Sequence, residues 1–270
     1  MAELITLLEG FGFGSDQGIV GFCSVHLVRA GGKTILFDTA HVGRRLVLQA
    51  ALARHDVRES EIDHVVMSHA HWDHVQNIDL FENADLLIHP DERRYAHRPH
   101  KNDWATPAWT GAAIETVRIS EVREGDELAP GVKIVEVPGH SPGSIALAVE
   151  TDAGLACLSG DALHFAEVAT IKRNPLVFWN DEQATASIEK LLRIADVIYP
   201  GHDQPFRLKD GAIEYVHPYT LGVSGVSMDG AALRQGASLL PPAPRVPWVM
   251  PGVEEQPGRL AQTVLPAPAR

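Results

Sequence analysis

The sequence predicts a layered α/β fold. Short apolar stretches typical of β-strands recur in both halves of the chain, and helical segments and glycine-containing turns separate them. The chain has 270 residues, of which 45% are hydrophobic and 21% are charged, so it can bury a large core. Because strands and helices accompany each other in both halves, we expect sheets that are covered by helices.

The first half contains five predicted strands and one predicted helix. The strands are apolar runs bounded by glycine or polar residues, and they span Glu3–Leu8, Phe22–Arg29, Lys33–Asp38, Asp63–Ser68 and Leu86–His89. A helix over 43–54 is predicted to bury one face, formed by Leu46, Val47, Ala50 and Ala51. The stretch Gly10–Gly14 lacks the Lys-Ser/Thr pair of a phosphate-binding loop, so we interpret it as a flexible hairpin loop.

The second half repeats this rhythm of strands and helices. Its predicted strands span Lys133–Val137, Ile145–Glu150, Leu155–Ser159 and Asp196–Tyr199. Asn180 is a suitable N-cap for a helix, and Asp181 and Glu182 place negative charge in the first turn, where the helix dipole favours it. This helix is predicted to bury Ile188, Leu191, Leu192 and Ala195.

Two stretches of the chain show little periodicity. Residues 93–111 are polar and aromatic, and they form either a substrate-binding loop or a surface loop whose tryptophans fill hydrophobic gaps. After about Val226 the chain is rich in proline, alanine and glycine. We therefore predict one folded domain over residues 1–225 and a flexible C-terminal extension over residues 226–270.

The charge and the cysteine content limit the partners and the compartment. The net charge of −12 disfavours binding to nucleic acid or to an anionic membrane. The sequence has no run of about 18 apolar residues and no basic start typical of a signal peptide, so we expect a cytoplasmic protein. Cys23 and Cys157 lie in apolar runs, where buried reduced thiols are expected.

Histidine is frequent, with 14 residues, and potential metal ligands are concentrated directly after the predicted strand Asp63–Ser68. His69, His71, Asp73 and His74 form the pattern H-x-H-x-D-H. Neutral imidazole and carboxylate are typical ligands of zinc and similar divalent metals. Because four ligands exceed what one catalytic tetrahedral site with an open water position needs, the pattern favours two metal ions.

Three more ligand candidates follow other predicted strands. His140, Asp161 and His202 each come directly after a glycine, which permits the sharp backbone turn needed to aim a side chain inward. Together with the H-x-H-x-D-H cluster they complete a set of seven candidate ligands.

These motifs as a group resemble the metallo-β-lactamase superfamily. The resemblance covers about residues 3–210 and rests on Asp38 in Leu36-Phe37-Asp38-Thr39, the H-x-H-x-D-H cluster, Gly139-His140-Ser141-Pro142-Gly143, Ser159-Gly160-Asp161 and Gly201-His202. It implies an αββα sandwich of two facing mixed sheets flanked by helices, with the site at one edge of the sheets.

The resemblance also implies a role for each candidate ligand. The first metal would be held by His69, His71 and His140. The second metal would be held by Asp73, His74 and His202, and Asp161 would bridge both. Asp38 would orient a ligand histidine, and Asp73 would also accept or relay a proton. The ligand types favour zinc, and manganese, iron and cobalt also suit them.

Several other residues are assigned by their surroundings. We expect surface or outer positions for His41, His89, His97, His100 and His217. His164 follows Asp161 by three positions and is a candidate for facing the substrate. An apolar substrate-binding wall is predicted from Trp104, Trp109, Phe165, Phe178 and Trp179.

The predicted reaction is metal-dependent hydrolysis of a small molecule with an apolar or ring portion. Two metal ions about 3.5–4 Å apart lower the pKa of a bridging water, and the resulting hydroxide would attack the carbonyl carbon of an ester, lactone or thioester. Chain length and Ser159-Gly160-Asp161 look most similar to acyl-homoserine-lactone lactonases and glyoxalase II thioesterases. However, Leu163, His164 and Phe165 stand where lactonases place a tyrosine.

Other functions remain as alternatives. The same two-metal site would suit a phosphodiesterase or nuclease-like hydrolase, although the net charge counts against a long nucleic acid. A mononuclear iron oxygenase that resembles persulfide dioxygenases and a non-catalytic binding protein are two further hypotheses. The C-terminal extension could also wrap a partner subunit in a homodimer.

Overall fold

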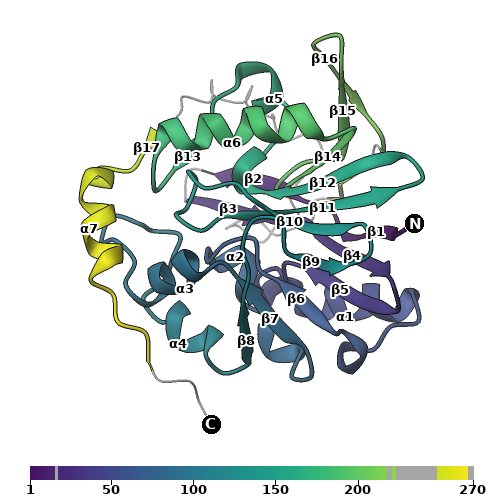
Figure 1. Ribbon diagram of the computed structural model, residues 1–270, viewed down its shortest axis with the longest axis horizontal. Coiled ribbons are helices and arrows are strands. Elements are labelled where there is room, and N and C mark those ends of the chain that lie inside the picture. Colours follow the sequence, from purple (N-terminus) through teal and green to yellow (C-terminus); the bar gives the residue numbers. More distant parts are fainter. Residues whose placement is uncertain (16–17, 218–220, 223–247, 267–270) are drawn as a thin grey trace, which may run out of the picture.

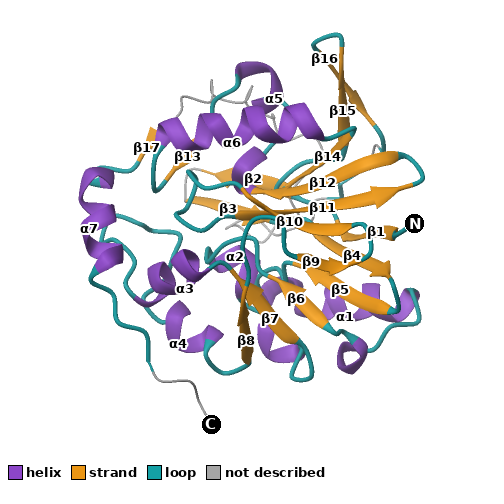
Figure 2. Cartoon of the chain, in the orientation of Figure 1, coloured by secondary structure: helices purple, strands orange, loops and turns teal. Residues whose placement is uncertain are grey.

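Two β-sheets face each other, and helices cover their outer faces, in the computed structural model of the chain (Figure 1). The structure describes residues 1–15, 18–217, 221–222 and 248–266. Figure 2 shows the resulting four layers, in which α6 covers one sheet and α1 covers the other. The predicted αββα sandwich of two mixed sheets is therefore confirmed.

The first sheet has the strand order β1-β4-β5-β6-β7-β8. Its first three strands are antiparallel, and β5 to β8 run parallel to one another. The strands span Glu3–Leu8 (β1), Val25–Ala30 (β4), Lys33–Phe37 (β5), His64–Val66 (β6), Asp85–Ile88 (β7) and Arg118–Glu121 (β8).

The second sheet has the strand order β16-β15-β14-β12-β11-β10-β9. Within it β12 and β14 are parallel, and the other neighbours are antiparallel. The strands span Glu127–Ala129 (β9), Val132–Glu136 (β10), Ile145–Thr151 (β11), Gly154–Gly160 (β12), Val197–Pro200 (β14), Phe206–Lys209 (β15) and Ala212–Tyr215 (β16).

The main core lies between the two sheets. Val28 and Ile35 of the first sheet and Ile134 and Leu147 of the second belong to one buried apolar cluster. The central strands also bury their opposite faces under helices, which explains why they are apolar at nearly every position. Burial on both faces holds the ends of these strands in fixed positions.

The helices lie on the outer faces and in the connections between strands. They span Arg45–Arg54 (α1), Trp72–Val75 (α2), Pro90–His97 (α3), Thr110–Ile114 (α4), Val168–Ile171 (α5), Asp181–Ile194 (α6) and Gln256–Ala261 (α7). The prediction for α6 is confirmed, since the Asn180 side chain accepts a hydrogen bond from Gln183 N at 2.8 Å. In the described ranges, no helix combines the length and the apolar character that crossing a bilayer requires.

The predicted buried face of α1 is wrong except at Ala51. Leu46 is 79% exposed and Val47 is 52% exposed, whereas Leu48, Ala51 and Leu52 are fully buried. Apolar residues occur around most of this helix, so its sequence does not single out one face. Contact with β1 selects the side that faces the sheet.

The glycine-rich stretch Gly10–Gly14 is not a flexible loop. Residues Phe11–Ser15 form β2, which pairs antiparallel with β3 (Gly18–Phe22). Phe11 stacks on Phe22 across the two strands, with ring centroids 4.3 Å apart. Alternation of phenylalanine with glycine therefore produces a hairpin with an aromatic face.

Part of the predicted flexible extension is folded onto the domain. Residues 223–247 and 267–270 lie outside the described residues, but Trp248–Val249 form β17, which pairs in parallel with β13 (Leu176–Val177). Met250 is buried in a cluster with Phe178 and Ala105. Met250, with Trp248 and Val253 packed against the same cluster, thus anchors the described part of this stretch to the domain.

A pair of leucine substitutions tests which face of α1 is buried. Leu52→Ala should lower the free energy of unfolding by about 2–5 kcal/mol because it leaves a cavity against the sheet. Leu46→Ala on the same helix should change it by less than about 0.5 kcal/mol. Urea denaturation of both variants checks this, and equal losses would contradict the arrangement.

Candidate metal centre

All seven predicted ligands lie at the ends of strands or directly after them. His69 and His71 occupy the turn between β6 and α2, and Asp73 and His74 lie in α2 itself. The other three follow β10, β12 and β14, in the order His140, Asp161 and His202. The two sheets therefore bring four separate segments, those after β6, β10, β12 and β14, to one edge of the sandwich.

Two glycines make room for Asp161 at this edge. Gly160 has φ +50°, a conformation that L side chains rarely adopt, and it turns the chain directly before the carboxylate. At Gly201 an added Cβ would collide with Asp161 Oδ1. The glycine that precedes His202 is thus required by the position of the neighbouring carboxylate.

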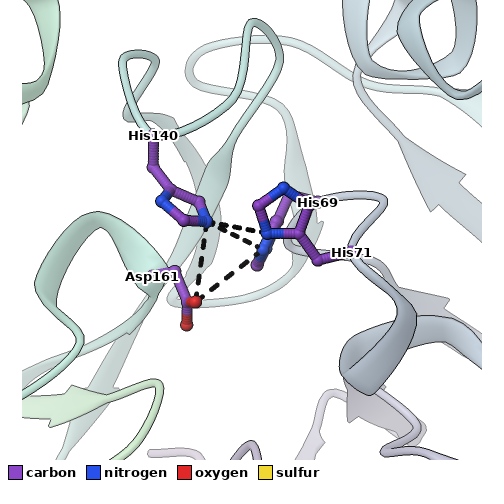
Figure 3. Close-up of side chains that lie close together, drawn as sticks. All are labelled: His69, His71, His140 and Asp161. Carbon is purple, nitrogen blue, oxygen red and sulfur yellow. Dashed lines mark hydrogen bonds and ion pairs between the residues drawn. The ribbon is translucent and has the colours of Figure 1, made fainter. Parts of the chain in front are cut away.

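His69, His71, His140 and Asp161 form the first group of converging atoms (Figure 3). His140 Nε2 lies 3.2 Å from His69 Nε2 and 2.9 Å from His71 Nδ1. Asp161 Oδ2 lies 3.6 Å from His140 Nε2 and 3.9 Å from His69 Nε2. All four side chains are buried.

The second group adjoins the first and contains Asp73, His74 and His202. His202 Nε2 lies 3.4 Å from Asp73 Oδ2 and 3.3 Å from Asp161 Oδ1. His74 Nε2 lies 3.4 Å from Asp161 Oδ1 as well. The two oxygens of the Asp161 carboxylate therefore face different groups.

These separations match the needs of a divalent cation. Tetrahedral ligands with bonds of about 2.0–2.1 Å lie about 3.3 Å from each other, close to the distances in both groups. His74 Nε2 and Asp161 Oδ1 are buried without a hydrogen-bond partner in the described residues, which is costly unless another group binds them. The residues present thus fit one cation in each group.

A third group, Cys23, Asp38 and His74, also satisfies the distance criteria for a metal site. However, Asp38 Oδ2 accepts hydrogen bonds from His74 Nδ1 at 2.8 Å and from Ser68 Oγ at 2.7 Å. Because these contacts already bind the carboxylate, Asp38 acts as the partner that fixes His74. Because His74 Nδ1 carries the proton of this hydrogen bond, His74 Nε2 has the free lone pair, and it faces the second group.

Other backbone and side-chain groups fix the remaining ligands. His140 Nδ1 donates to the carbonyl oxygen of Leu176 at 2.6 Å, so its Nε2 is the atom left to bind a cation. Glu92 in α3 is fully buried and accepts hydrogen bonds from Ala70 N at 2.7 Å, Ser141 Oγ at 2.8 Å and Gly143 N at 2.9 Å. Its carboxylate therefore joins the turn that carries His69 and His71 to the turn that carries His140.

The histidine pKa values differ between the two groups. Burial lowers the pKa of His71 to about 3 and holds the pKa values of His69 and His140 well below the usual range. Burial alone would lower the pKa of His74 and His202, but the acidic groups around them raise both values. The first group therefore offers neutral imidazoles, whereas a cation in the second group competes with protons.

A cavity of about 670 Å³ opens above both groups. Asp73, His164 and Asp161 lie in its wall, and His164 Nε2 is 3.0 Å from Asp161 Oδ2. The other lining residues are mainly aromatic or apolar, and they include Phe11, Phe13, Ile19, Trp72, Trp104, Phe165 and Phe178. Lysine and arginine are absent from the lining in the described part of the chain.

The structure brings only some of the predicted substrate residues to this cavity. Trp104, His164, Phe165 and Phe178 line it. Trp109 does not line it and instead precedes α4 with 49% of its surface exposed. Trp179 also lies away from it, because its indole donates to Gln183 Oε1 at 2.9 Å. Within the predicted loop region 93–111, Trp104 thus lies in the cavity wall and Trp109 lies at the surface.

The sequence analysis missed three contributors to the site. The hairpin β2–β3 covers the cavity with Phe11, Phe13 and Ile19, and the alternation of phenylalanine with glycine was the available signal. Glu92 and Asp103 lie on the side of the ligand turns that faces away from the cavity. No sequence motif around either residue indicated this position. Their partners lie far away in the chain, so only the tertiary structure identifies them.

Comparisons with known proteins agree with this geometry. The family model of the metallo-beta-lactamase superfamily matches residues 18–202. Metallo-beta-lactamase domain-containing protein 1 of Xenopus laevis is 32% identical over 68% of this chain and 72% of its own length. An N-acyl homoserine lactonase of Bacillus cereus is 28% identical over 56% of this chain and 60% of its own.

A solved structure has the same fold. The probable metal-dependent hydrolase of Staphylococcus aureus superposes with a TM-score of 0.64 at 18% identity, covering 82% of this chain and 98% of that one. At this identity the likeness concerns the fold alone.

Replacing the buried carboxylate in α3 tests its role in joining the two ligand turns. At pH 8, Glu92→Gln should lower the free energy of unfolding by roughly 1–3 kcal/mol, since an amide nitrogen cannot accept from the buried donors. Asp91→Asn on the same helix removes only an exposed ion pair with Arg94 and should cost less than about 1 kcal/mol. Urea denaturation of both apo variants checks this, and losses of equal size would contradict the joining role.

Proposed function

The chain belongs to the metallo-beta-lactamase superfamily, and on that premise we propose that it is a two-metal hydrolase of neutral esters, lactones or thioesters. The proposal is supported by two adjoining groups of ligand atoms that share Asp161, and by an apolar cavity above them. The absence of lysine and arginine among the described residues that line the cavity is the observation that favours this substrate class.

We assign one cation to His69, His71 and His140 and a second to Asp73, His74 and His202, with Asp161 shared. Imidazole and carboxylate ligands at these separations suit zinc best, and manganese, iron and cobalt are the other candidates. Such a pair of cations supplies Lewis-acid activation of water and of a substrate carbonyl group.

The cavity wall favours neutral acyl groups over anionic substrates. A phosphodiester or a substrate with free carboxylates carries charge outside the reacting group, and enzymes bind such charge with lysine or arginine. Those residues are missing among the cavity-lining positions that the structure describes. The phosphodiesterase alternative therefore lacks support, although the ligand groups alone would suit it.

Two side chains in the wall are placed for proton transfer and hydrogen bonding. Asp73 is 6% exposed and faces the cavity, so its carboxylate can take a proton from an attacking water. His164 lies beside Asp161 and can donate an N–H to a substrate oxygen from the opposite side. Phe165 and the hairpin β2–β3 add apolar surface to the cavity wall around these two groups.

The lactonase relative is consistent with this substrate class. Its name describes a ring ester with an acyl chain, which is a neutral substrate with one apolar arm. The space between the hairpin and Phe178 offers a place for such an arm. Because Leu163, His164 and Phe165 replace the expected tyrosine region, we propose a different ring or leaving group from that of the lactonase.

A matched substrate pair tests the proposed class. Zinc-loaded protein should hydrolyse 4-nitrophenyl butyrate at least about tenfold better in kcat/KM than 4-nitrophenyl hemisuccinate, because the described lining residues include no lysine or arginine to pair with the added carboxylate. Removal of metal by a chelator should abolish turnover, and zinc should restore it. Turnover of bis-(4-nitrophenyl) phosphate without turnover of esters, lactones or thioesters would refute the proposal.

An aromatic substitution tests the acyl-binding wall. Phe165→Ala should lower kcat/KM for 4-nitrophenyl hexanoate by about 5- to 30-fold, since roughly 1–2 kcal/mol of apolar contact is lost. Its effect on 4-nitrophenyl acetate should be smaller. Trp109→Ala, an exposed aromatic outside the cavity, serves as the control and should leave both values unchanged.

A further inference from the structure

The C-terminal segment Trp248–Ala261 packs directly behind the first group of ligands. Figure 1 shows it, in yellow, beside α3 and β13. Trp248 N donates to Pro175 O at 2.9 Å and Met250 N donates to Val177 O at 2.8 Å. These bonds pair β17 with β13 in a two-stranded parallel sheet. On the other side, Asn102 Nδ2 donates to Pro251 O at 2.7 Å.

A chain of hydrogen bonds leads from this segment toward His71. Gln256 is 1% exposed, and its Nε2 donates to Tyr95 Oη at 3.2 Å. Tyr95 Oη donates to Asp103 Oδ2 at 2.7 Å. Asp103 Oδ1 accepts from Ala105 N at 2.8 Å, which fixes the carboxylate plane. The tyrosine hydroxyl has one proton, so the Gln256 amide must act as the donor.

His71 needs a partner on the side that faces away from the ligand group. Its Nδ1 points to His140, and its Nε2 is buried without a hydrogen-bond acceptor among the described residues. Asp103 Oδ2 is 3.9 Å from that nitrogen and belongs to a side chain that is itself buried. A metal-binding histidine ordinarily gives its second N–H to such a carboxylate, as His74 does to Asp38.

The same segment also reaches His140. The Leu176 carbonyl that accepts from His140 Nδ1 belongs to β13, the strand with which β17 pairs. His140 therefore has a partner on the strand with which the C-terminal segment pairs, and the carboxylate nearest to His71 Nε2 belongs to Asp103, which the segment reaches through Tyr95. The corresponding partners of His74 and His69 are Asp38 and Ser68, which follow β5 and β6 of the first sheet and belong to neither β13 nor α3.

We propose that the C-terminal segment is a positioning element for the first cation, and that Gln256 acts through Tyr95 and Asp103 on His71. The inference rests on the two-metal site of the proposed function. It gives a role in metal binding to a segment that lies beyond the region matched by the family model. Loss of these contacts should lower the affinity for the first cation only, because none of them reaches a ligand that belongs to the second group alone.

The test measures zinc affinity in competition with a chromophoric chelator. Gln256→Met keeps the size of the side chain and removes its donor, and Tyr95→Phe removes the next hydroxyl. Each should weaken one of the two zinc sites by about tenfold and leave the other unchanged. The double variant should be no weaker than Tyr95→Phe alone, because the two residues act in series. Glu254→Gln, an exposed neighbour of Gln256, is the control.

The outcomes separate this inference from the proposed function. Wild-type protein that fails to bind two zinc ions would overturn both. Wild-type binding of two ions with unchanged affinities in Gln256→Met and Tyr95→Phe would overturn only the positioning role. Equal weakening of both zinc sites, in parallel with lower unfolding stability, would show a merely structural contact and would also overturn it.

Discussion

The site depends on one buried carboxylate that two groups of histidines share. Asp161 turns Oδ2 toward His140 and Oδ1 toward His74 and His202, so the two groups cannot move apart without losing a ligand. An isolated carboxylate in such a position would be costly to ionise. The surrounding histidines hold the pKa of Asp161 well below the usual range even though burial alone would raise it, which keeps the shared carboxylate charged.

The rest of the fold serves to hold the ligands around that carboxylate. Strands buried on both faces end at a common edge, and each ligand turn has a second contact behind it. Asp38 fixes His74, the Leu176 carbonyl fixes His140, and Glu92 joins two turns that come from different sheets. Because these contacts are themselves buried, the ligand set is preorganised before any cation binds.

The sequence predicted the layers and the seven candidate ligands because both depend on local patterns. Apolar runs identify buried strands, and histidine or aspartate after a glycine marks the turn that follows. The errors occurred where the outcome depends on a distant partner. Leu46 and Leu48 are equally apolar, and only the sheet decides which is buried. The folded tail could not be predicted, since its proline-rich beginning hides the few apolar residues, such as Met250, that anchor it.

Charged side chains are concentrated in the two ligand groups, whereas the cavity wall above them is mainly neutral. Reaction chemistry and substrate selection therefore depend on different residues. The charged side chains Asp73 and Asp161 lie in the two ligand groups, where bound cations would balance their negative charge. The wall above can therefore be built from neutral rings, which discriminate by shape and by removal of water rather than by ion pairing. Most of those rings belong to the hairpin β2–β3 and to the loops that carry Trp104 and Phe165. The C-terminal segment also contacts the Trp104 loop through Asn102, so the proposed positioning role would link changes in that segment both to the cavity wall and to metal affinity.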